Sequence, residues 1–348
     1  MISLGFFPVR KILFNRSRCN MQPQKSVCVV GGAGYIGSHM VTLLKSKGYT
    51  VVVFDDLSNG HAEAIKDVEL FQGSILDREA LTEFFSQYDF ECVFHFASLI
   101  QVGESVSNPS LYYQNNVVGS INLLDCMIAR GIKKIIFSST AAIFGSPLRS
   151  PIDEDHPKSP LSPYGKTKLF VEETLKDYDT AYGLKSISLR YFNAAGAAPD
   201  GMLGERHNPE THLIPLVLQH ASNRQESFSI FGDDYSTPDG TCIRDYIHVA
   251  DLCDAHLLAL KFLEVNNRSE AFNLGTGVGH SVAEIIDIAQ TISEKSFDIT
   301  VLSRRPGDPS VLIADGTKAR KILGWDPKWG IEEIIAHAWG WEKKFPWQ

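Results

Sequence analysis

The chain has 348 residues, of which 44% are hydrophobic and 21% charged, and its 33 basic and 41 acidic side chains give a net charge of −8. This length fits one large domain or two modest ones, and the composition excludes a mainly disordered protein. Nucleic acid is not expected as a partner, because binding to phosphates normally needs a basic surplus or a basic stripe. No apolar run is long enough to span a bilayer, so no membrane partner is expected.

Residues 1–25 differ from the rest of the chain, because they are basic and contain no acidic residue. A transit peptide has this character, but a disordered extension, or an upstream start codon before Met21, is the favoured interpretation. A secretory signal is excluded, because the apolar residues precede the basic ones instead of following them.

From residue 26 onward, short β-branched runs alternate with segments of helical periodicity. Strands are expected over 26–30, 50–54, 68–72, 92–96, 134–138 and 186–191, and helices over 35–47, 77–88, 111–130 and 165–182. This alternation predicts an α/β fold, with a Rossmann-like, doubly wound parallel sheet over residues 26–192.

The pattern loosens from about residue 193. Turn-rich stretches over 197–208, 232–241 and 304–309 interrupt helices expected over 214–223, 250–264 and 282–294. We interpret residues 193–348 as mainly a smaller C-terminal α/β lobe that binds the substrate, with some of this chain returning to the first domain. Ligands of doubly wound sheets lie beyond the carboxyl ends of the strands, so the cleft between the lobes is the predicted site.

A glycine-rich segment, Gly31-Gly-Ala-Gly34-Tyr-Ile-Gly37, separates the first strand from the first helix. Glycine lets the backbone turn sharply and approach a pyrophosphate, which then faces the amides and the dipole of the helix N-terminus. Asp55, at the tip of the second strand, can accept hydrogen bonds from ribose hydroxyls and repels a 2′-phosphate. No basic residue follows as far as Gly60, so the segment predicts NAD rather than NADP.

Tyr164 and Lys168 share one face of a helix that is expected to begin after Ser162. A phenol with a pKa of about 10 is a poor base, but a nearby ammonium group and an oxidised nicotinamide favour the phenolate. Tyr164 can then take a proton from a substrate hydroxyl, which Thr140 could also hydrogen-bond, while hydride leaves for the cofactor. A Tyr-x-x-x-Lys spacing is common on exposed helices, so it indicates a catalytic pair only in combination with the glycine-rich segment.

The eleven histidines and six cysteines show no His-x-x-x-His spacing and no Cys-x-x-Cys pair. The sequence therefore predicts no metal site and no disulfide scaffold. Scattered cysteines of this kind are typical of a reducing compartment, so a cytoplasmic location is predicted.

With these motifs, the sequence resembles the extended short-chain dehydrogenase/reductase superfamily and, within it, the UDP-glucose 4-epimerases. The similarity runs from about residue 26 to about residue 344 and includes Phe-Ser-Ser-Thr140, Arg-Tyr-Phe-Asn193 and Ile-Arg-Asp-Tyr-Ile-His248. It implies an isomerase that inverts carbon 4 of a UDP-hexose through a transient 4-keto sugar, using NAD that stays bound.

The resemblance also implies roles for individual residues. Tyr164 is the implied base, Lys168 holds the nicotinamide ribose and tunes the tyrosine, and Thr140 stands where the family has Ser or Thr. The implied NAD-binding residues are Gly31, Gly34, Tyr35, Ile36, Gly37, Asp55, Asn59, Ser74, Ile75, Phe96, Ala97, Asn115, Tyr164, Lys168 and Phe192. The implied UDP-sugar-binding residues are Thr140, Tyr164, Asn193, His212, Leu213, Phe231, Arg244, Arg305, Asp308 and Leu312.

Several positions depart from the family pattern. Ser74 stands where a carboxylate often contacts adenine, and Ile100 replaces a lysine near the cofactor, so some NAD contacts are expected to be weakened or rerouted. His212 replaces an asparagine near UDP. The residue at position 312 helps to decide whether an N-acetyl group fits, and with Leu312 the acceptance of UDP-N-acetylhexosamines stays open.

Other functions on the same scaffold stay open as well. UDP-N-acetylglucosamine, UDP-pentose and UDP-uronate 4-epimerases share the mechanism, whereas a 4,6-dehydratase needs an acid and a base where Ala141 and Ala142 stand. A non-catalytic NAD-sensing regulator would be expected to lack Tyr164 or Lys168. Similar proteins pair the helices expected over 111–130 and 165–182 across a two-fold axis, so a homodimer is predicted.

Overall fold

The computed structural model describes residues 25–305 and 308–345, so the predicted extension lies outside the described residues except for Lys25. The central sheet has seven strands, and every neighbouring pair is parallel. In chain order these are β1 (Ser26–Val30), β2 (Thr50–Asp55), β3 (Glu69–Gln72), β4 (Cys92–His95), β5 (Lys134–Thr140), β6 (Lys185–Tyr191) and β11 (Glu270–Leu274). In space their order is β11-β6-β5-β4-β1-β2-β3.

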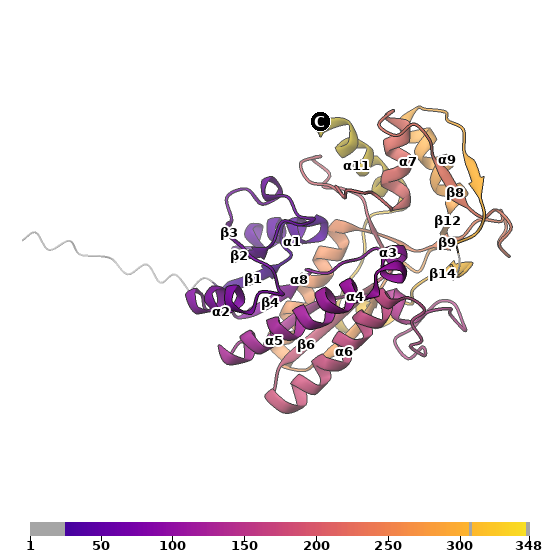
Figure 1. Ribbon diagram of the computed structural model, residues 1–348. Coiled ribbons are helices and arrows are strands. Elements are labelled where there is room, and N and C mark those ends of the chain that lie inside the picture. Colours follow the sequence, from indigo (N-terminus) through magenta and orange to yellow (C-terminus); the bar gives the residue numbers. More distant parts are fainter. Residues whose placement is uncertain (1–24, 306–307, 346–348) are drawn as a thin grey trace, which may run out of the picture.

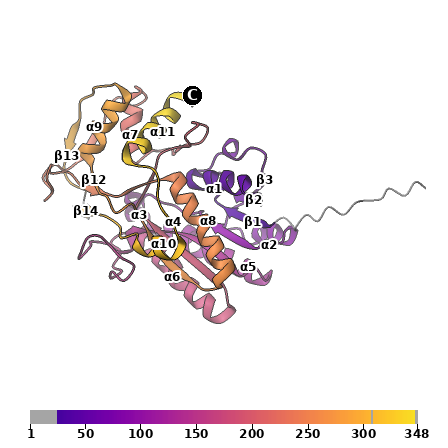
Figure 2. The ribbon, with the colours of Figure 1, turned by 180° about the vertical axis from the view of Figure 1, so that it is seen from behind.

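Helices cover both faces of this sheet, as Figures 1 and 2 show from opposite sides. One face packs against α1 (Tyr35–Ser46), α8 (Val249–Asn266) and α10 (Thr317–Leu323), and the other against α2 (Arg78–Gln87), α5 (Gly119–Ala129) and α6 (Pro163–Tyr182). Alternation along β1 explains the two cores, because Val27 and Val29 face the first set while Cys28 and Val30 face the second. The predicted α/β, doubly wound, Rossmann-like sheet is confirmed.

One strand of the sheet and one flanking helix differ from the prediction. Strand β11 was not among the expected strands, and it brings residues 270–274 beside β6. The helix expected over 111–130 is divided into α4 (Pro109–Tyr112), a π-helical turn η2 (Tyr113–Val118) and α5. The π-turn draws the side chain of Asn116 into the interior, where it bonds to the backbone of Leu99. The boundary at residue 192 stays a prediction.

The C-terminal lobe packs three helices around a core of its own, which includes Val217, Ile285 and Ile335. These helices are α7 (Leu213–Ala221), α9 (Val282–Ser293) and α11 (Ile331–Lys344), and α11 was not among the expected helices. Small sheets and short helices complete the described chain: β7 (Asn193–Ala195), β8 (Ser229–Phe231), β9 (Ile243–Arg244), β10 (Tyr246–His248), β12 (His280–Ser281), β13 (Thr300–Leu302), β14 (Val311–Leu312), η1 (Ala62–Ile65), α3 (Val102–Ser107) and η3 (Ala141–Ile143).

Between residues 25 and 345, leaving aside 306–307, no helix combines the length and the apolar character needed to cross a membrane.

Among the described residues, five histidines are buried: His39, His95, His156, His248 and His256. His256 lies on α8 between two aromatic rings, with its ring centroid 4.9 Å from that of Phe96. Its Nδ1 donates to the carbonyl of Leu252 (2.8 Å), and its Nε2 makes no hydrogen bond within the described chain. Burial lowers the pKa of His256 from 6.5 to about 4, so the imidazole is neutral near pH 7.

We expect this histidine to make the protein less stable in acid. The unfolded chain binds the proton near pH 6.5 and the folded chain only near pH 4, so the free energy of unfolding falls as the pH drops between these values. Between pH 7 and pH 5, this one group lowers the free energy of unfolding by about 2 kcal/mol. Urea unfolding at a fixed NAD concentration should therefore show that the free energy of unfolding falls less between pH 7 and pH 5 for His256→Leu than for the parent. His280→Gln, which removes a histidine outside the core, should behave like the parent; an unchanged pH response in His256→Leu would contradict the assignment.

Candidate active site

A cavity of about 510 Å³ lies where the carboxyl ends of the strands meet the C-terminal lobe. It is lined by Tyr35 at the start of α1, Thr140 at the end of β5, Tyr164 in the first turn of α6 and Arg244 of β9. A second pocket of about 100 Å³ adjoins it along β1 and β2, and Phe96 lines both.

Most of the predicted site residues line one of these two spaces. The larger cavity includes Tyr35, Ile36, Gly37, Phe96, Thr140, Tyr164, Phe192, Asn193, His212, Leu213, Arg244, Asp308 and Leu312. The smaller pocket includes Gly31, Asp55, Asn59, Ile75, Phe96, Ala97 and Asn115. The five predicted residues that line neither are Gly34, Ser74, Lys168, Phe231 and Arg305.

The junction of β1 and α1 leaves no space for side chains at two glycines, Gly31 in the loop and Gly37 in the first turn of α1. Gly31 has a φ of +79°, and a Cβ there would lie 2.5 Å from the backbone nitrogen of Ala97. A Cβ on Gly37 would lie 2.1 Å from the carbonyl oxygen of Gly31. The first turn of α1 also carries no acidic side chain. Bare backbone at a helix N-terminus is what a dinucleotide pyrophosphate requires, so the loop fits NAD.

The carboxylate of Asp55 closes this loop against β2. Its Oδ2 accepts a hydrogen bond from Ala33 N (2.9 Å) and its Oδ1 one from Leu57 N (2.8 Å). Burial raises the pKa of Asp55, and these two backbone hydrogen bonds lower it. The side chain lines the smaller pocket, so its remaining lone pairs face the position where the sequence predicts a ribose.

The π-turn η2 places two neighbouring asparagines differently. Asn115 lines the smaller pocket, while buried Asn116 accepts from Leu99 N (2.8 Å) and donates to Leu99 O (3.0 Å) and to Thr167 Oγ1 (3.2 Å). Asn116 therefore connects the loop after β4 to helix α6. Sequence reasoning missed this positioning residue, although a paired Asn in an otherwise apolar helix is a signal for it.

Tyr164 and Thr140 meet at the wall of the cavity. Ser162 caps α6 by accepting from Gly165 N (3.1 Å), which fixes the turn that carries Tyr164. Burial raises the pKa of Tyr164, and a hydrogen bond with the side chain of Thr140 lowers it. The structure thus brings the two residues together as the sequence predicts for a shared substrate hydroxyl.

Lys168 lies behind this wall and is 1% exposed. Its Nζ donates to Ser98 Oγ (2.8 Å) and to Ser138 O (2.8 Å), and it lies 5.9 Å from the ring centroid of Tyr164. Burial lowers the pKa of Lys168 to about 7. The tuning of Tyr164 by Lys168 and the contact of Lys168 with the nicotinamide ribose both stay predictions.

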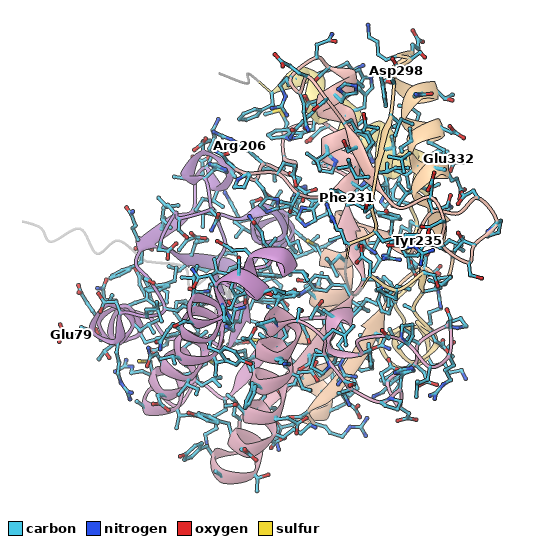
Figure 3. All side chains as sticks on the ribbon, turned by 45° about the vertical axis from the view of Figure 1, so that its right-hand side comes forward. Glu79, Arg206, Phe231, Tyr235, Asp298 and Glu332 are labelled. Atoms are coloured by element: carbon cyan, nitrogen blue, oxygen red, sulfur yellow. The ribbon has the colours of Figure 1, made fainter. Side chains whose placement is uncertain are left out.

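The predicted UDP residues fall into two groups. Arg244 and Asp308 line the cavity, with 3.7 Å between Arg244 Nη2 and Asp308 Oδ1. Phe231 and Arg305 line neither space, and the Arg305 guanidinium instead lies 3.9 Å from the centroid of the Phe231 ring. Figure 3 shows Phe231 on the C-terminal lobe.

Asp245, next to Arg244, holds this side of the cavity together and was not singled out from the sequence. Its carboxylate is fully buried and accepts hydrogen bonds from Thr276 N (2.9 Å), Thr276 Oγ1 (2.8 Å), Gly277 N (3.0 Å) and Ala314 N (3.2 Å). Its backbone carbonyl accepts from Asn193 Nδ2 (2.9 Å). A carboxylate within a short apolar strand segment was the available signal.

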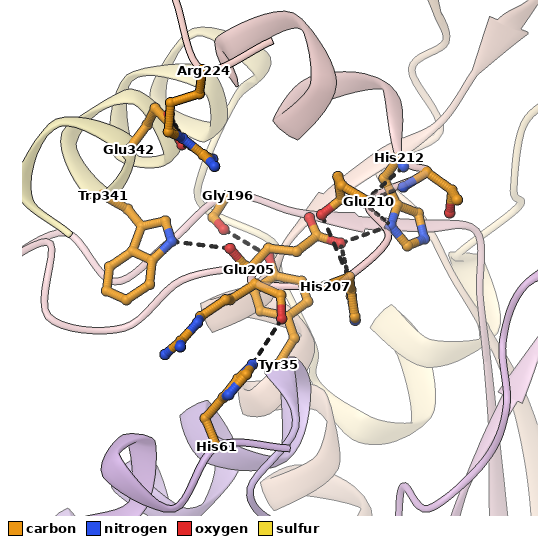
Figure 4. Close-up of polar contacts among 12 residues, drawn as sticks. Tyr35, His61, Gly196, Glu205, His207, Glu210, His212, Arg224, Trp341 and Glu342 are labelled. Atoms are coloured by element: carbon orange, nitrogen blue, oxygen red, sulfur yellow. Dashed lines mark hydrogen bonds and ion pairs between the residues drawn. The ribbon is translucent and has the colours of Figure 1, made fainter. Parts of the chain in front are cut away.

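Two glutamates and two histidines form a cluster at the same cavity: Glu205, His207, Glu210 and His212 (Figure 4). The expectation that the histidines form no cluster with metal-binding potential is wrong at this point. The four side chains come from an irregular loop, so neither a helical nor a Cys/His spacing rule detects them.

We expect Asp245→Asn to destabilise the protein. The new amide group would direct N–H donors at backbone N–H donors, so at least one buried hydrogen bond is lost and the free energy of unfolding should fall by about 3 kcal/mol. Urea unfolding measures this. Asp315→Asn is the matched control, because Asp315 hydrogen-bonds to Thr317 (2.9 Å to its backbone N) at a more exposed position. Equal losses in the two variants would argue against the role of Asp245.

Comparison with known proteins shows extensive similarity. Residues 27–275 match the model of the NAD dependent epimerase/dehydratase family. A UDP-glucose 4-epimerase of Rhizobium meliloti (strain 1021) is 48% identical over 319 residues, which cover 92% of this chain and 97% of that protein. The crystal structure of UDP-glucose 4-epimerase from Brucella ovis in complex with NAD has a TM-score of 0.88 at 47% identity, covering 90% of this chain and 97% of that one. The structure from Bifidobacterium longum in complex with NAD+ and UDP has a TM-score of 0.89 at 37% identity, covering 92% and 99%.

Proposed function

Because the chain belongs to the NAD dependent epimerase/dehydratase family, we propose that it interconverts UDP-glucose and UDP-galactose by inverting carbon 4 of the sugar. The family and the use of NAD, both predicted from the motifs, are confirmed by the matches. The observation that carries the proposal is that Tyr164 and Thr140 line one cavity that also borders the glycine-rich segment at Gly37.

The smaller pocket and the adjoining wall of the cavity would hold the cofactor. Gly31, Asp55 and Asn115 would contact it there, and bound NAD supplies an acceptor that takes a hydride from carbon 4 and can return it. Since a hydride returned to the same face regenerates the substrate, inversion requires the keto sugar to present its other face. The sugar part of the cavity must therefore be roomy, and recognition must rest mainly on the nucleotide.

Tyr164 would take the proton of the sugar 4-hydroxyl, and Thr140 would hold that hydroxyl by a hydrogen bond. Burial disfavours a phenolate at Tyr164, so a nearby positive charge is needed to stabilise it. In its protonated form, Lys168 would provide that charge from a fixed position, because its Nζ donates to Ser98 and Ser138. When the proton returns to the alkoxide of the inverted sugar, Tyr164 is ready for another cycle.

Arg244 and Asn193 would anchor the UDP part. The Arg244 guanidinium lines the cavity and suits a diphosphate, and the Asn193 amide is held by the carbonyl of Asp245. Leu312 lines the same cavity and is the residue expected to limit an N-acetyl group. An NMR assay over UDP-hexoses, UDP-N-acetylhexosamines and UDP-pentoses would define the range of accepted sugars.

Tyr164→Phe removes the proton acceptor and keeps the ring. We expect turnover of UDP-galactose, followed by NMR without added reductant, to fall at least about 100-fold while NAD stays bound. Tyr178→Phe is the matched control on the same helix, where the phenol donates to Asp125 (2.6 Å), and it should keep parental turnover. A Tyr164→Phe enzyme as active as the parent would refute the catalytic assignment.

We also propose the homodimer that the sequence analysis predicts. Leu111, Val118 and Phe170 are 39%, 40% and 56% exposed on α4, η2 and α6, and these elements pack against one another. Exposed apolar side chains on adjacent helices favour a protein–protein contact there. The cytoplasmic location stays a prediction.

Phe170→Glu would place a charge in the proposed interface. We expect analytical ultracentrifugation to find a dimer for the parent and a monomer for this variant, because burying an unpaired carboxylate is costly. Val265→Glu, at an apolar position that is 82% exposed on α8, serves as the control and should stay dimeric. A dimeric Phe170→Glu protein would exclude this surface.

A further inference from the structure

Four side chains with metal-binding atoms converge at one end of the cavity. Glu205, His207, Glu210 and His212 lie on the loop over residues 197–212 that leads to α7, and one ligand atom from each lies within 4.8 Å of all the others. Figure 4 shows the four side chains directed toward one another. No step of the proposed reaction uses this convergence.

The separations of these atoms suit a single small cation. His212 Nδ1 lies 2.9 Å from Glu205 Oε1 and 2.9 Å from Glu210 Oε1. His207 Nδ1 lies 3.1 Å from Glu205 Oε1 and 3.6 Å from Glu210 Oε2. A tetrahedral zinc ion with bonds of about 2.1 Å holds its ligand atoms about 3.4 Å apart. Three of the four separations are shorter than that value and one is longer, so these side chains would have to move slightly apart to bind the ion.

Within the described chain, two of the converging atoms are contacted by polar groups of the cluster itself and by no other hydrogen-bond partner. They are His207 Nδ1 and Glu210 Oε2, and both are buried. The Glu210 side chain is 4% exposed, and its other oxygen, Oε1, already accepts from Thr211 N (2.7 Å) and His212 N (2.9 Å). Backbone amides therefore orient this carboxylate and leave Oε2 directed at the centre of the cluster, as outer hydrogen bonds do for metal-binding carboxylates.

The loop that carries the cluster is attached to rigid elements on both sides. Trp341 Nε1 of α11 donates to Glu205 O (3.0 Å), and Tyr35 Oη of α1 donates to Gly196 O (2.7 Å). On the N-terminal side, Arg206 pairs with Glu63 (2.6 Å), and Figure 3 shows Arg206 beside that half of the chain. Ligands on a backbone fixed in this way keep their mutual positions, which a metal site requires.

We propose that Glu205, His207, Glu210 and His212 bind one divalent transition-metal ion of the zinc class, which fastens the loop over residues 197–212 to the cavity. Two imidazoles with two carboxylates favour zinc over magnesium or calcium, because those harder ions take oxygen ligands. The ion replaces the proton that a histidine otherwise needs between two carboxylates. The proposal rests on ligand geometry and does not depend on the proposed reaction.

In the alternative state, no metal ion is bound and protonated histidines pair with the carboxylates. Burial disfavours a charge on His207, but the carboxylates of Glu205 and Glu210 outweigh it and raise the pKa of His207 to about 9. Imidazolium–carboxylate pairs alone could then hold the loop. Measurement of metal content separates the two states, because ion pairs bind no zinc.

The untagged full-length protein, loaded with Zn2+ and dialysed against metal-free buffer, is expected to retain one zinc ion per chain by mass spectrometry. Addition of Co2+ should give the intense visible absorption of a tetrahedral site. Zinc should also raise the thermal unfolding temperature. These readouts do not require activity, so they are independent of whether the proposed epimerase reaction is correct.

Substitutions in the cluster test whether the zinc ion binds there. Glu210→Gln and His207→Gln should each weaken zinc binding at least about tenfold and abolish the zinc-dependent rise in unfolding temperature. His280→Gln is the matched control, since it breaks another His–Glu pair (2.8 Å) and should bind zinc like the parent. Parental protein that retains no zinc and gives no tetrahedral cobalt spectrum overturns the proposal even if the variants fail to fold. Undiminished binding by folded Glu210→Gln overturns it as well.

Discussion

The candidate active site depends on buried polar contacts that attach helix α6 to the sheet. The Lys168 ammonium donates to the carbonyl of Ser138 on β5. One turn further along α6, Glu172 accepts from Ser139 Oγ (2.6 Å) and pairs with Arg190 of β6 (2.7 Å), and both charged side chains are at most 3% exposed. Breaking such pairs leaves a buried charge without a partner, so the helix cannot slide along the strands. This fixed position places Tyr164 opposite Thr140.

Two kinds of structure meet at the cavity. On the sheet side, the ends of β1, β4 and β5 carry Phe96 and Thr140 on a scaffold with apolar cores on both faces. On the lobe side, Arg244, Leu312 and the loop over residues 197–212 are held by short strands and by single polar side chains, of which Asp245 connects the most segments. Both predicted sets combine regular elements with the turns beside them. Tyr35 and Asp55 of the cofactor set lie in α1 and β2, and Arg244 and Leu312 of the sugar-nucleotide set lie in β9 and β14.

The sequence was informative where a local rule decides the structure. The range of β1 was predicted without error, and α1 and α6 within two residues, because the glycine-rich segment and the cap Ser162 mark the ends of elements. Strand β11 and the π-turn η2 were missed, since strand pairing and an interior hydrogen bond from Asn116 are not visible in periodicity. Asp245 and the Glu205 cluster were missed for the same reason, because their partners are distant in sequence or brought together by an irregular loop.

Helix α11, the last described helix, reaches back to the parts of the chain made first. Through Trp341 it holds the carbonyl of Glu205, and the loop of Glu205 leads from Gly196, which Tyr35 of α1 binds. During synthesis on a ribosome, the strands from β1 to β6 can pair before either β11 or α11 has emerged. The chamber that would hold the sugar nucleotide is therefore complete only after α11 has been made, and the nascent chain carries its cofactor loop long before it has a finished substrate pocket.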